Sequence, residues 1–139
     1  MFDAGNPQEV KDAVEALKSR HPVGHFVLKM DADEQKTFRL RSLPRFAPGV
    51  EGGGGTQVVE RNGDRMVVSS GLNLDNAKKV AAKHGLQIDF TILVAHELGH
   101  AWYLAYVNPD SKKGDPHSDA MALAWENSLR DSDAQRHKH

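Results

Sequence analysis

Residues 89–107 read DFTILVAHELGHAWYLAYV, and this stretch decides the fold. It is apolar on most sides and contains no proline, which predicts a helix buried in the middle of a domain. Asn108-Pro109 follow directly and end the helix. His and Glu are costly in such apolar surroundings unless they are paired or ligated, so His96, Glu97 and His100 are candidates for a metal site.

The three residues form an H-E-x-x-H motif, in which two histidines stand four residues apart on one helix. Residues at this spacing lie on the same helix face, so both imidazoles can reach one tetrahedral zinc ion at about 2.0–2.1 Å. Glu97 borders the same site and is placed to take a proton from a water that zinc activates. We therefore predict Zn²⁺ as cofactor, His96 and His100 as metal ligands, and Glu97 as the catalytic base.

A catalytic zinc site takes a third protein ligand and leaves one position open for water. Glu126 is the only Glu downstream of the motif and lies in the apolar segment ALAWEN, where burial is costly unless the carboxylate is bound. We favour Glu126 as the third ligand. Asp119 and His117, at the start of the same predicted helix, are the alternatives. Tyr103, three residues after His100, is a further candidate for the site, although an aromatic residue here is more often part of the core.

The rest of the chain predicts further helices and a small antiparallel sheet. Helices are expected over 8–20, 76–84 and 116–130, a strand over 37–41, a hairpin of 57–60 with 66–69, a loop over 44–56, and a surface tail over 131–139. A second short helix around Phe26 is left open. Asn62-Gly63 is a strong hairpin signal because both residues tolerate positive φ. We expect a hairpin strand, Met66–Ser70, at the edge of the sheet, where it could hold an extended substrate.

Composition narrows the class of protein. The 139 residues, taken as one domain over 1–139, carry a net charge of −1, which argues against a broad electrostatic nucleic-acid binder. Cysteine is absent, so disulfides, thiolate zinc sites and cysteine nucleophiles are excluded. The start of the sequence has no signal-peptide pattern, and no apolar run approaches the ~20 residues of a membrane span.

The segments LVAHELGHAW and AWENSLR, followed by RHKH at 136–139, resemble the zinc-peptidase effector domains of bacterial secretion systems. These include type III effector peptidases and the toxin domains of type VI spike and Rhs-type proteins. The resemblance implies a zincin-like fold and a protein or peptide substrate. It also implies delivery into a target cell, with a parent secretion polypeptide or an immunity protein as partner, and it makes the Glu of the Glu-Asn pair, Glu126, a plausible zinc ligand. Members often carry a longer acidic cluster before that pair, where this chain has only residues 115–119.

The sequence thus predicts a single α+β domain of zincin-like type, with a small antiparallel sheet packed on a zinc-bearing helix and a C-terminal helix after it. The predicted function is a zinc-dependent endopeptidase. Two alternatives stay open: a zinc hydrolase of a non-peptide or cell-wall amide bond, and a metal-binding domain without turnover. Glu97 speaks against the latter, because a purely structural site has no use for a general base.

Overall fold

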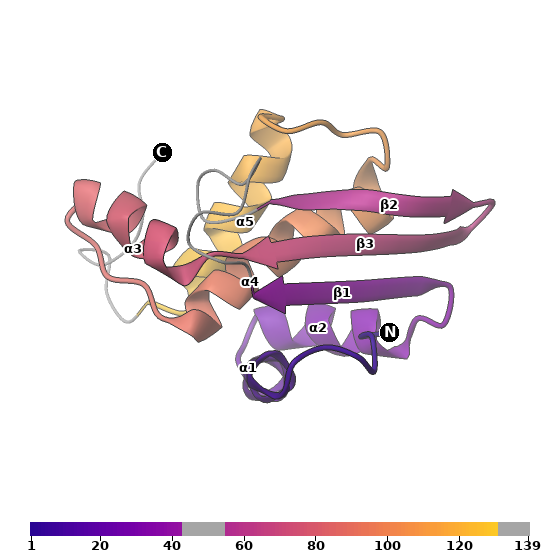
Figure 1. Ribbon diagram of the computed structural model, residues 1–139, viewed down its shortest axis with the longest axis horizontal. Helices are drawn as coiled ribbons and strands as arrows, with labels where there is room; N and C mark the ends of the chain where they lie inside the picture. The colour runs from indigo at the N-terminus through magenta and orange to yellow at the C-terminus, as the bar shows by residue number, and fades with distance from the viewer. Residues whose placement is uncertain (43–54, 131–139) are drawn as a thin grey trace.

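The computed structural model describes residues 1–42 and 55–130, and in this part of the chain it has an α+β fold (Figure 1). The elements in chain order are α1 (Gln8–Lys18), α2 (Val23–Ala32), β1 (Lys36–Ser42), β2 (Thr56–Asn62), β3 (Arg65–Leu72), α3 (Leu74–Lys83), α4 (Phe90–Trp102), the π-helical segment η1 (Tyr103–Val107) and α5 (Pro116–Ser128). The predicted tail over 131–139, and all of the predicted loop over 44–56 except Gly55 and Thr56, lie outside the described residues.

The helix predictions are confirmed, with ends that differ by a few residues. Val10, Val14 and Leu17 form the buried face of α1, and Asp115 caps the start of α5 with Pro116 in its first turn. The second short helix also exists, as α2. The helix predicted over 89–107 corresponds to α4 and η1 together. Its last five residues have the wider hydrogen-bond pattern of a π-helix, which ends before Asn108. No helix of the described residues is long and apolar enough to cross a membrane.

The sheet is mixed, not antiparallel as predicted. β3 lies in the middle, antiparallel to β2 and parallel to β1. The hairpin prediction is correct, with Gly63 at φ 62° in the turn. The error concerns β1, because its pairing is long-range and no local turn sets its direction. β3 takes the centre since Met66, Val68 and Leu72 are buried along its length, whereas most side chains of β2 are exposed.

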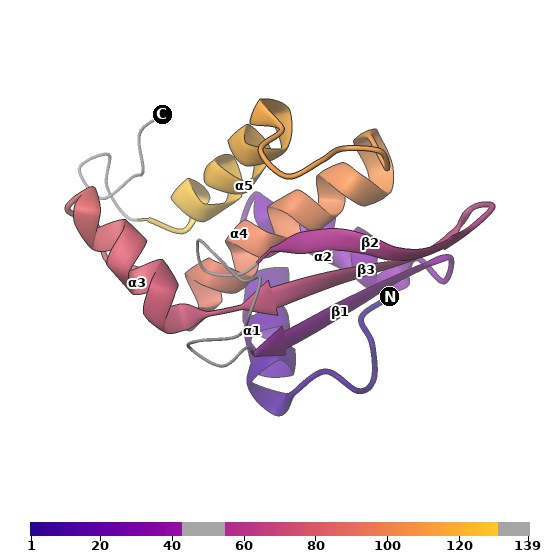
Figure 2. The ribbon, with the colours of Figure 1, turned by 45° about the horizontal axis from the view of Figure 1, so that its top comes forward.

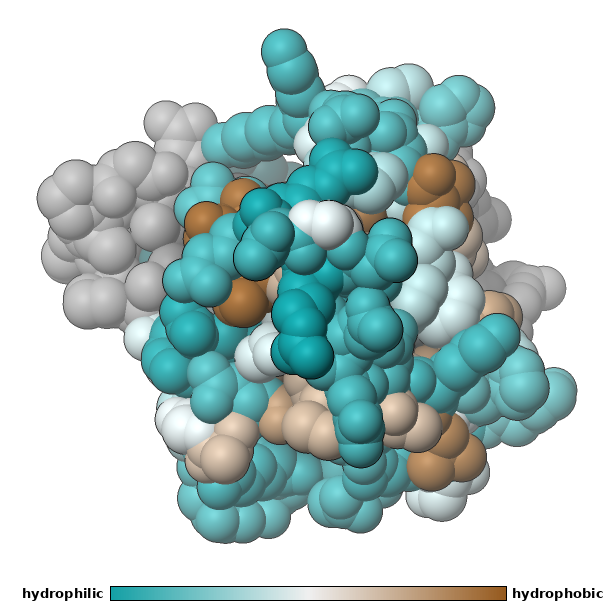
Figure 3. Space-filling model, turned by 90° about the vertical axis from the view of Figure 1, so that its right-hand side faces the viewer, coloured by the Kyte–Doolittle hydropathy of each residue, from teal (hydrophilic) through white to brown (hydrophobic). Residues whose placement is uncertain are grey.

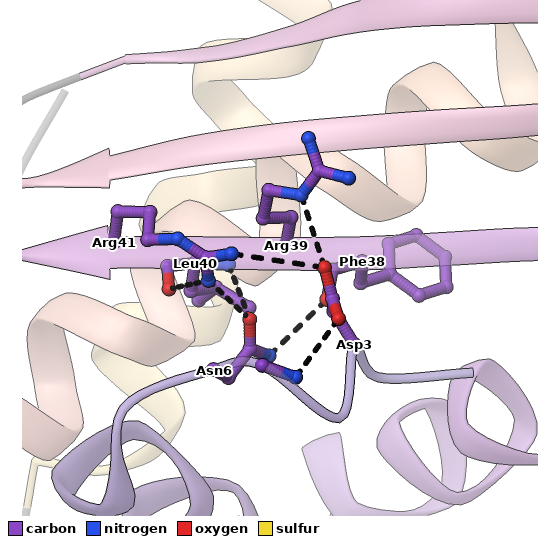
Figure 4. Close-up of polar contacts among 7 residues, drawn as sticks. Asp3, Asn6, Phe38, Arg39, Leu40 and Arg41 are labelled. Atoms are coloured by element: carbon purple, nitrogen blue, oxygen red, sulfur yellow. Dashed lines mark hydrogen bonds and ion pairs between the residues drawn. The ribbon is translucent and has the colours of Figure 1, made fainter.

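The outer edge of β1 is occupied by the start of the chain. Phe2 forms a parallel bridge with Phe38, and the backbone of Asp3 donates a hydrogen bond to the Phe38 carbonyl. Figure 4 shows Asp3 and Asn6 against β1, where Asp3 accepts from Arg39 at 3.0 Å and the Asn6 side chain bonds the backbone on both sides of that residue. Among the described segments, the outer edge of β2 has no such partner.

The helices α1, α2 and α4 lie on one face of the sheet, and α5 packs against α4 (Figures 1 and 2). One hydrophobic core joins them, with Leu93, Val94 and Leu98 of α4 almost fully buried among residues of α1, α2 and β3. The predicted central helix is therefore correct in position as well as in type. His96 and His100 of this helix line a cavity together with residues at the start of β2 and in the first turn of α5.

Candidate metal and catalytic site

The three residues of the motif line one large cavity of about 940 Å³. Its walls come from the start of β2, the end of β3, the loop between η1 and α5, and the first turn of α5. His96 and His100 are half-buried, while Glu97 is only 3% exposed. His96, Glu97 and His100 thus line one common cavity, and their role as a metal site stays a prediction.

The His96 ring is hydrogen-bonded to the carboxylate of Glu126. The Nδ1 atom of His96 lies 2.8 Å from Oε1 of Glu126. Burial lowers the pKa of His96, but the Glu126 hydrogen bond and the nearby charges of Glu97, Glu126 and Asp119 together raise it above its usual value. A carboxylate can only accept a hydrogen bond, so Nδ1 is the donor and, in the neutral ring, Nε2 carries the lone pair. Nε2 is the atom left for a metal.

His100 is held in the same manner by α5. Its Nδ1 lies 2.7 Å from the hydroxyl of Ser118, and burial followed by the charge of His96 lowers its pKa to about 4. A neutral imidazole is the form that binds metals. The two ring centroids are 5.0 Å apart. With Zn–N bonds of about 2.0–2.1 Å, two imidazoles on one tetrahedral ion have centroids roughly 5 Å apart, so the pair fits a shared zinc ion.

Glu97 is buried and bonded to the sheet. Its Oε2 accepts a hydrogen bond of 2.7 Å from the hydroxyl of Thr56, the first residue of β2. Burial raises the pKa of Glu97, against the opposing effects of His96 and the Thr56 hydrogen bond. A raised pKa suits a residue that takes up and returns a proton near neutral pH.

The contacts of Glu126 differ from those expected of a third zinc ligand. Its Oε1 is bonded to Nδ1 of His96 and its Oε2 accepts 2.7 Å from Arg130. It does not line the large cavity. It lines a small cavity of about 60 Å³ against α3, together with His96 and Glu97. Glu126 therefore stands on the Nδ1 side of the His96 ring, opposite the free nitrogen, and these contacts favour a supporting role.

The two alternatives to Glu126, Asp119 and His117, differ in whether they line the cavity. Asp119 lines it and lies close enough to raise the pKa of His96, whereas His117 is exposed and does not line it. Across residues 1–42 and 55–130, no three His, Cys, Asp or Glu side chains stand together in an arrangement that could hold a metal ion. The two histidines thus form a pair, and within the described residues no third His, Cys, Asp or Glu is gathered with them.

Sequence reasoning missed two residues that support the site, Ser118 and Thr56. Their contacts with the motif span 18 and 41 positions along the chain, so no local pattern indicates them. The ion pair of Glu126 with Arg130, in contrast, is the one that their i, i+4 spacing on a helix predicts. Tyr103 is buried and does not line the cavity, as the more common core role of an aromatic residue implies.

Comparisons with protein-family models, with curated proteins and with solved structures found no match for this chain.

Proposed function

We propose that this chain is a zinc-dependent endopeptidase. The observation that carries the proposal is the fixed pair of imidazoles. His96 and His100 are each bonded at Nδ1, and both line, together with the buried Glu97, a cavity large enough for a peptide segment. Hydrogen-bonded partners of this kind orient metal-binding histidines and set their tautomer.

Zinc would be held by His96, His100 and Asp119, with Glu126 acting as the partner of His96. This departs from the Glu126 ligand that we favoured from sequence. It is supported by the cavity position of Asp119 and by the engagement of both Glu126 oxygens. Because the three groups are not gathered without metal, Asp119 would turn toward the pair when zinc binds.

A bound zinc ion lowers the pKa of its water toward about 7 and polarises a substrate carbonyl. Glu97 would take the proton from the attacking water and pass it to the leaving amine. The Thr56 hydroxyl fixes one oxygen of Glu97 and leaves the other for this transfer. The raised pKa of Glu97 keeps the carboxyl able to hold the proton between the two events.

An extended peptide would bind along the outer edge of β2. The edge expected from sequence, Met66–Ser70, is wrong, because that segment belongs to the central strand and pairs on both sides. The start of β2, Thr56 to Val58, lines the cavity, and within the described residues no strand covers its outer side. A peptide added there would gain backbone hydrogen bonds and pass beside Glu97.

The zincin-like fold and the role as a delivered bacterial effector or toxin domain belong to this proposal through the sequence resemblance. The α+β class and the α4–α5 helix pair support the fold assignment. A cell-wall amide hydrolase would use the same residues, so the substrate must be tested directly. The non-catalytic alternative does not account for a buried Glu97 that faces the cavity and has a raised pKa.

The decisive experiment combines metal analysis with an activity assay on denatured protein and on peptidoglycan. The purified chain should hold about one zinc per molecule and cleave the protein substrate. Glu97→Gln should retain zinc and fold while losing turnover by a factor of about 10² or more, because only proton transfer is removed. His96→Ala/His100→Ala should lose the metal. Stoichiometric zinc in that double variant, or full activity in Glu97→Gln, would contradict the proposal.

A further inference from the structure

One wall of the cavity is a short loop, residues 109–114, between η1 and α5. The loop is well anchored. Asn108 accepts backbone hydrogen bonds from Asp110 and Ser111, and the Ser111 hydroxyl donates to Asp115 at 2.8 Å. Arg61 of β2 reaches across to Asp110 at 3.2 Å. These contacts hold the backbone of residues 112 and 113 close to β2 and α5.

Those two residues are Lys112 and Lys113. Both line the cavity and are exposed, and neither forms an ion pair with another described residue. Two of the other charges on the walls are paired, Asp110 with Arg61 and Arg41 with Asp3 at 3.8 Å. The carboxylates of Glu97 and Asp119 also line the cavity, and both belong to the proposed zinc site. Lys112 and Lys113 thus form a positively charged part of the wall, the lysine wall, with which no described carboxylate is paired.

We propose that Lys112 and Lys113 select peptides with acidic side chains at the positions that pass this loop. The inference rests on the proposed function, since it names the substrate class of the same cavity. Opposite charges on a binding surface and its ligand favour association by attraction and by faster encounter. The lysine wall and the open edge of β2 face one cavity, so an extended acidic peptide can use both at once.

The charge of the chain favours an acidic peptide over a nucleic acid as the ligand of this cavity. The chain carries a net charge of −1, and nucleic-acid binding would need a broad basic face. The end of the molecule that carries the β2–β3 turn is mostly hydrophilic, and its apolar side chains are separated from one another (Figure 3). A large apolar ligand is therefore not favoured at this end of the molecule, which lies at the other end of β2 from the cavity-lining residues Thr56 to Val58.

The test is a binding measurement on the inactive Glu97→Gln protein, with and without added Zn²⁺. The probes are a fluorescent peptide in which Glu alternates with Val, its Gln and Lys counterparts, and a single-stranded oligothymidine. The Glu peptide should bind about three- to tenfold more tightly than the Gln peptide, with the difference shrinking as salt is raised. Lys112→Glu/Lys113→Glu should reverse the order of the Glu and Lys peptides.

The matched control is Lys78→Glu/Lys79→Glu, which makes the same change of charge on the exposed side of α3, away from the cavity. This control should leave the preference for the Glu peptide intact. Equal binding of the Glu and Gln peptides, an equal effect of the control, or tighter lysine-dependent binding of the oligothymidine would overturn the inference. If the wild-type chain binds the Glu peptide selectively but cleaves no peptide, the proposed endopeptidase function is contradicted, whereas the inference on Lys112 and Lys113 is supported.

Discussion

Thr56 Oγ1 lies 2.7 Å from Oε2 of Glu97 and 2.8 Å from the hydroxyl of Ser70. If Thr56 donates its proton to the carboxylate, Ser70 must donate to Thr56, because each hydroxyl has one proton. Ser70 is buried in β3, so this chain of hydrogen bonds begins in the centre of the sheet and ends on the proposed base. The sheet therefore fixes the direction of the Glu97 carboxylate.

Thr56→Val removes the hydroxyl and keeps the shape of the side chain. We expect kcat to fall about tenfold, the equivalent of one hydrogen bond, while KM and zinc affinity stay close to wild type. Thr56→Ser should retain most of the activity, and Thr37→Val in β1 should have no effect on kcat. Steady-state kinetics on metal-loaded protein measures this. A loss of zinc affinity in Thr56→Val, or an equal loss of kcat in Thr56→Ser, would mean that Thr56 has a different role.

The distance between α4 and α5 depends on Gly99, the fourth residue of the motif. A Cβ atom placed there would lie 2.7 Å from the Cα of Ala122, closer than real Cβ contacts. Since Ala122 offers backbone at this point and no flexible side chain, α5 would have to move. The same helix carries Ser118 and Glu126, the partners of the two histidines.

Gly99→Ala should therefore lower stability and metal affinity together. Overpacking of this kind costs about 1–3 kcal/mol of unfolding free energy. Urea denaturation and a zinc competition assay measure the two effects. Gly55→Ala is the control, because nothing lies within 4 Å of its Cβ position. A variant that loses stability but keeps full zinc affinity would show that α5 does not set the geometry of the histidine pair.

Sequence reasoning recovered the features that are encoded locally. Helical spacing identified α1, Asp115-Pro116 placed the start of α5, and Gly63 placed the hairpin turn. It failed where distant segments meet. The parallel pairing of β1 with β3 spans about 30 positions and has no turn to set its direction. The error for Met66–Ser70 follows from this, because β1 turns a hairpin strand into the central one.

In the candidate site, too, the features encoded locally were predicted and those that depend on distant contacts were not. The spacing of His96 and His100 follows from the helix period, and the position of Glu97 follows with it. The role of Glu126 depends on which side of the His96 ring α5 presents, and a sequence does not contain that information. Arg130 decides the matter in part, because its guanidinium binds Oε2 of Glu126 and also donates to the carbonyl of Gln87.

The contact of Asp3 with β1 predicts a specific pH dependence of stability. The backbone N–H of Gly5, and then Arg39, lower the pKa of Asp3 below its ordinary value of 3.8 (Figure 4). A carboxyl with a depressed pKa in the folded state stabilises the protein above its unfolded pKa, and this contribution is lost as the pH falls through the folded pKa.

Asp3→Asn should thus be less stable than the wild type at neutral pH by about 1 kcal/mol or less, as is usual for a partly exposed pair. The difference should shrink as the pH falls below about 4. Denaturation curves at several pH values measure it, with Asp64→Asn in the β2–β3 turn as a control of the same chemistry. A stability difference for Asp3→Asn that stays constant down to acidic pH would contradict the assignment.

The third zinc ligand can be identified by comparing conservative variants of Asp119, Glu126 and His117. Glu126→Gln keeps an oxygen for Nδ1 of His96 and avoids leaving a large gap in α5. It should weaken zinc binding by about 10- to 100-fold, as expected for the partner of a ligating histidine. Asp119→Asn should weaken zinc binding more than Glu126→Gln, because it removes a charged donor from the metal. His117→Ala should bind zinc as the wild type does.

The same variants have a second measurement that requires no metal. Imidazole nitrogen NMR shifts of the metal-free chain report the tautomer of His96, which Glu126 sets by accepting from Nδ1. Glu126→Gln should increase the population of the other tautomer, while Asp119→Asn should leave Nδ1 protonated in the neutral ring. If Asp119→Asn keeps wild-type zinc affinity and Glu126→Gln abolishes binding, Glu126 is the ligand and must leave His96 when zinc binds. If the affinities follow the expected order and only Glu126→Gln shifts the tautomer, Asp119 binds the metal and Glu126 orients the histidine.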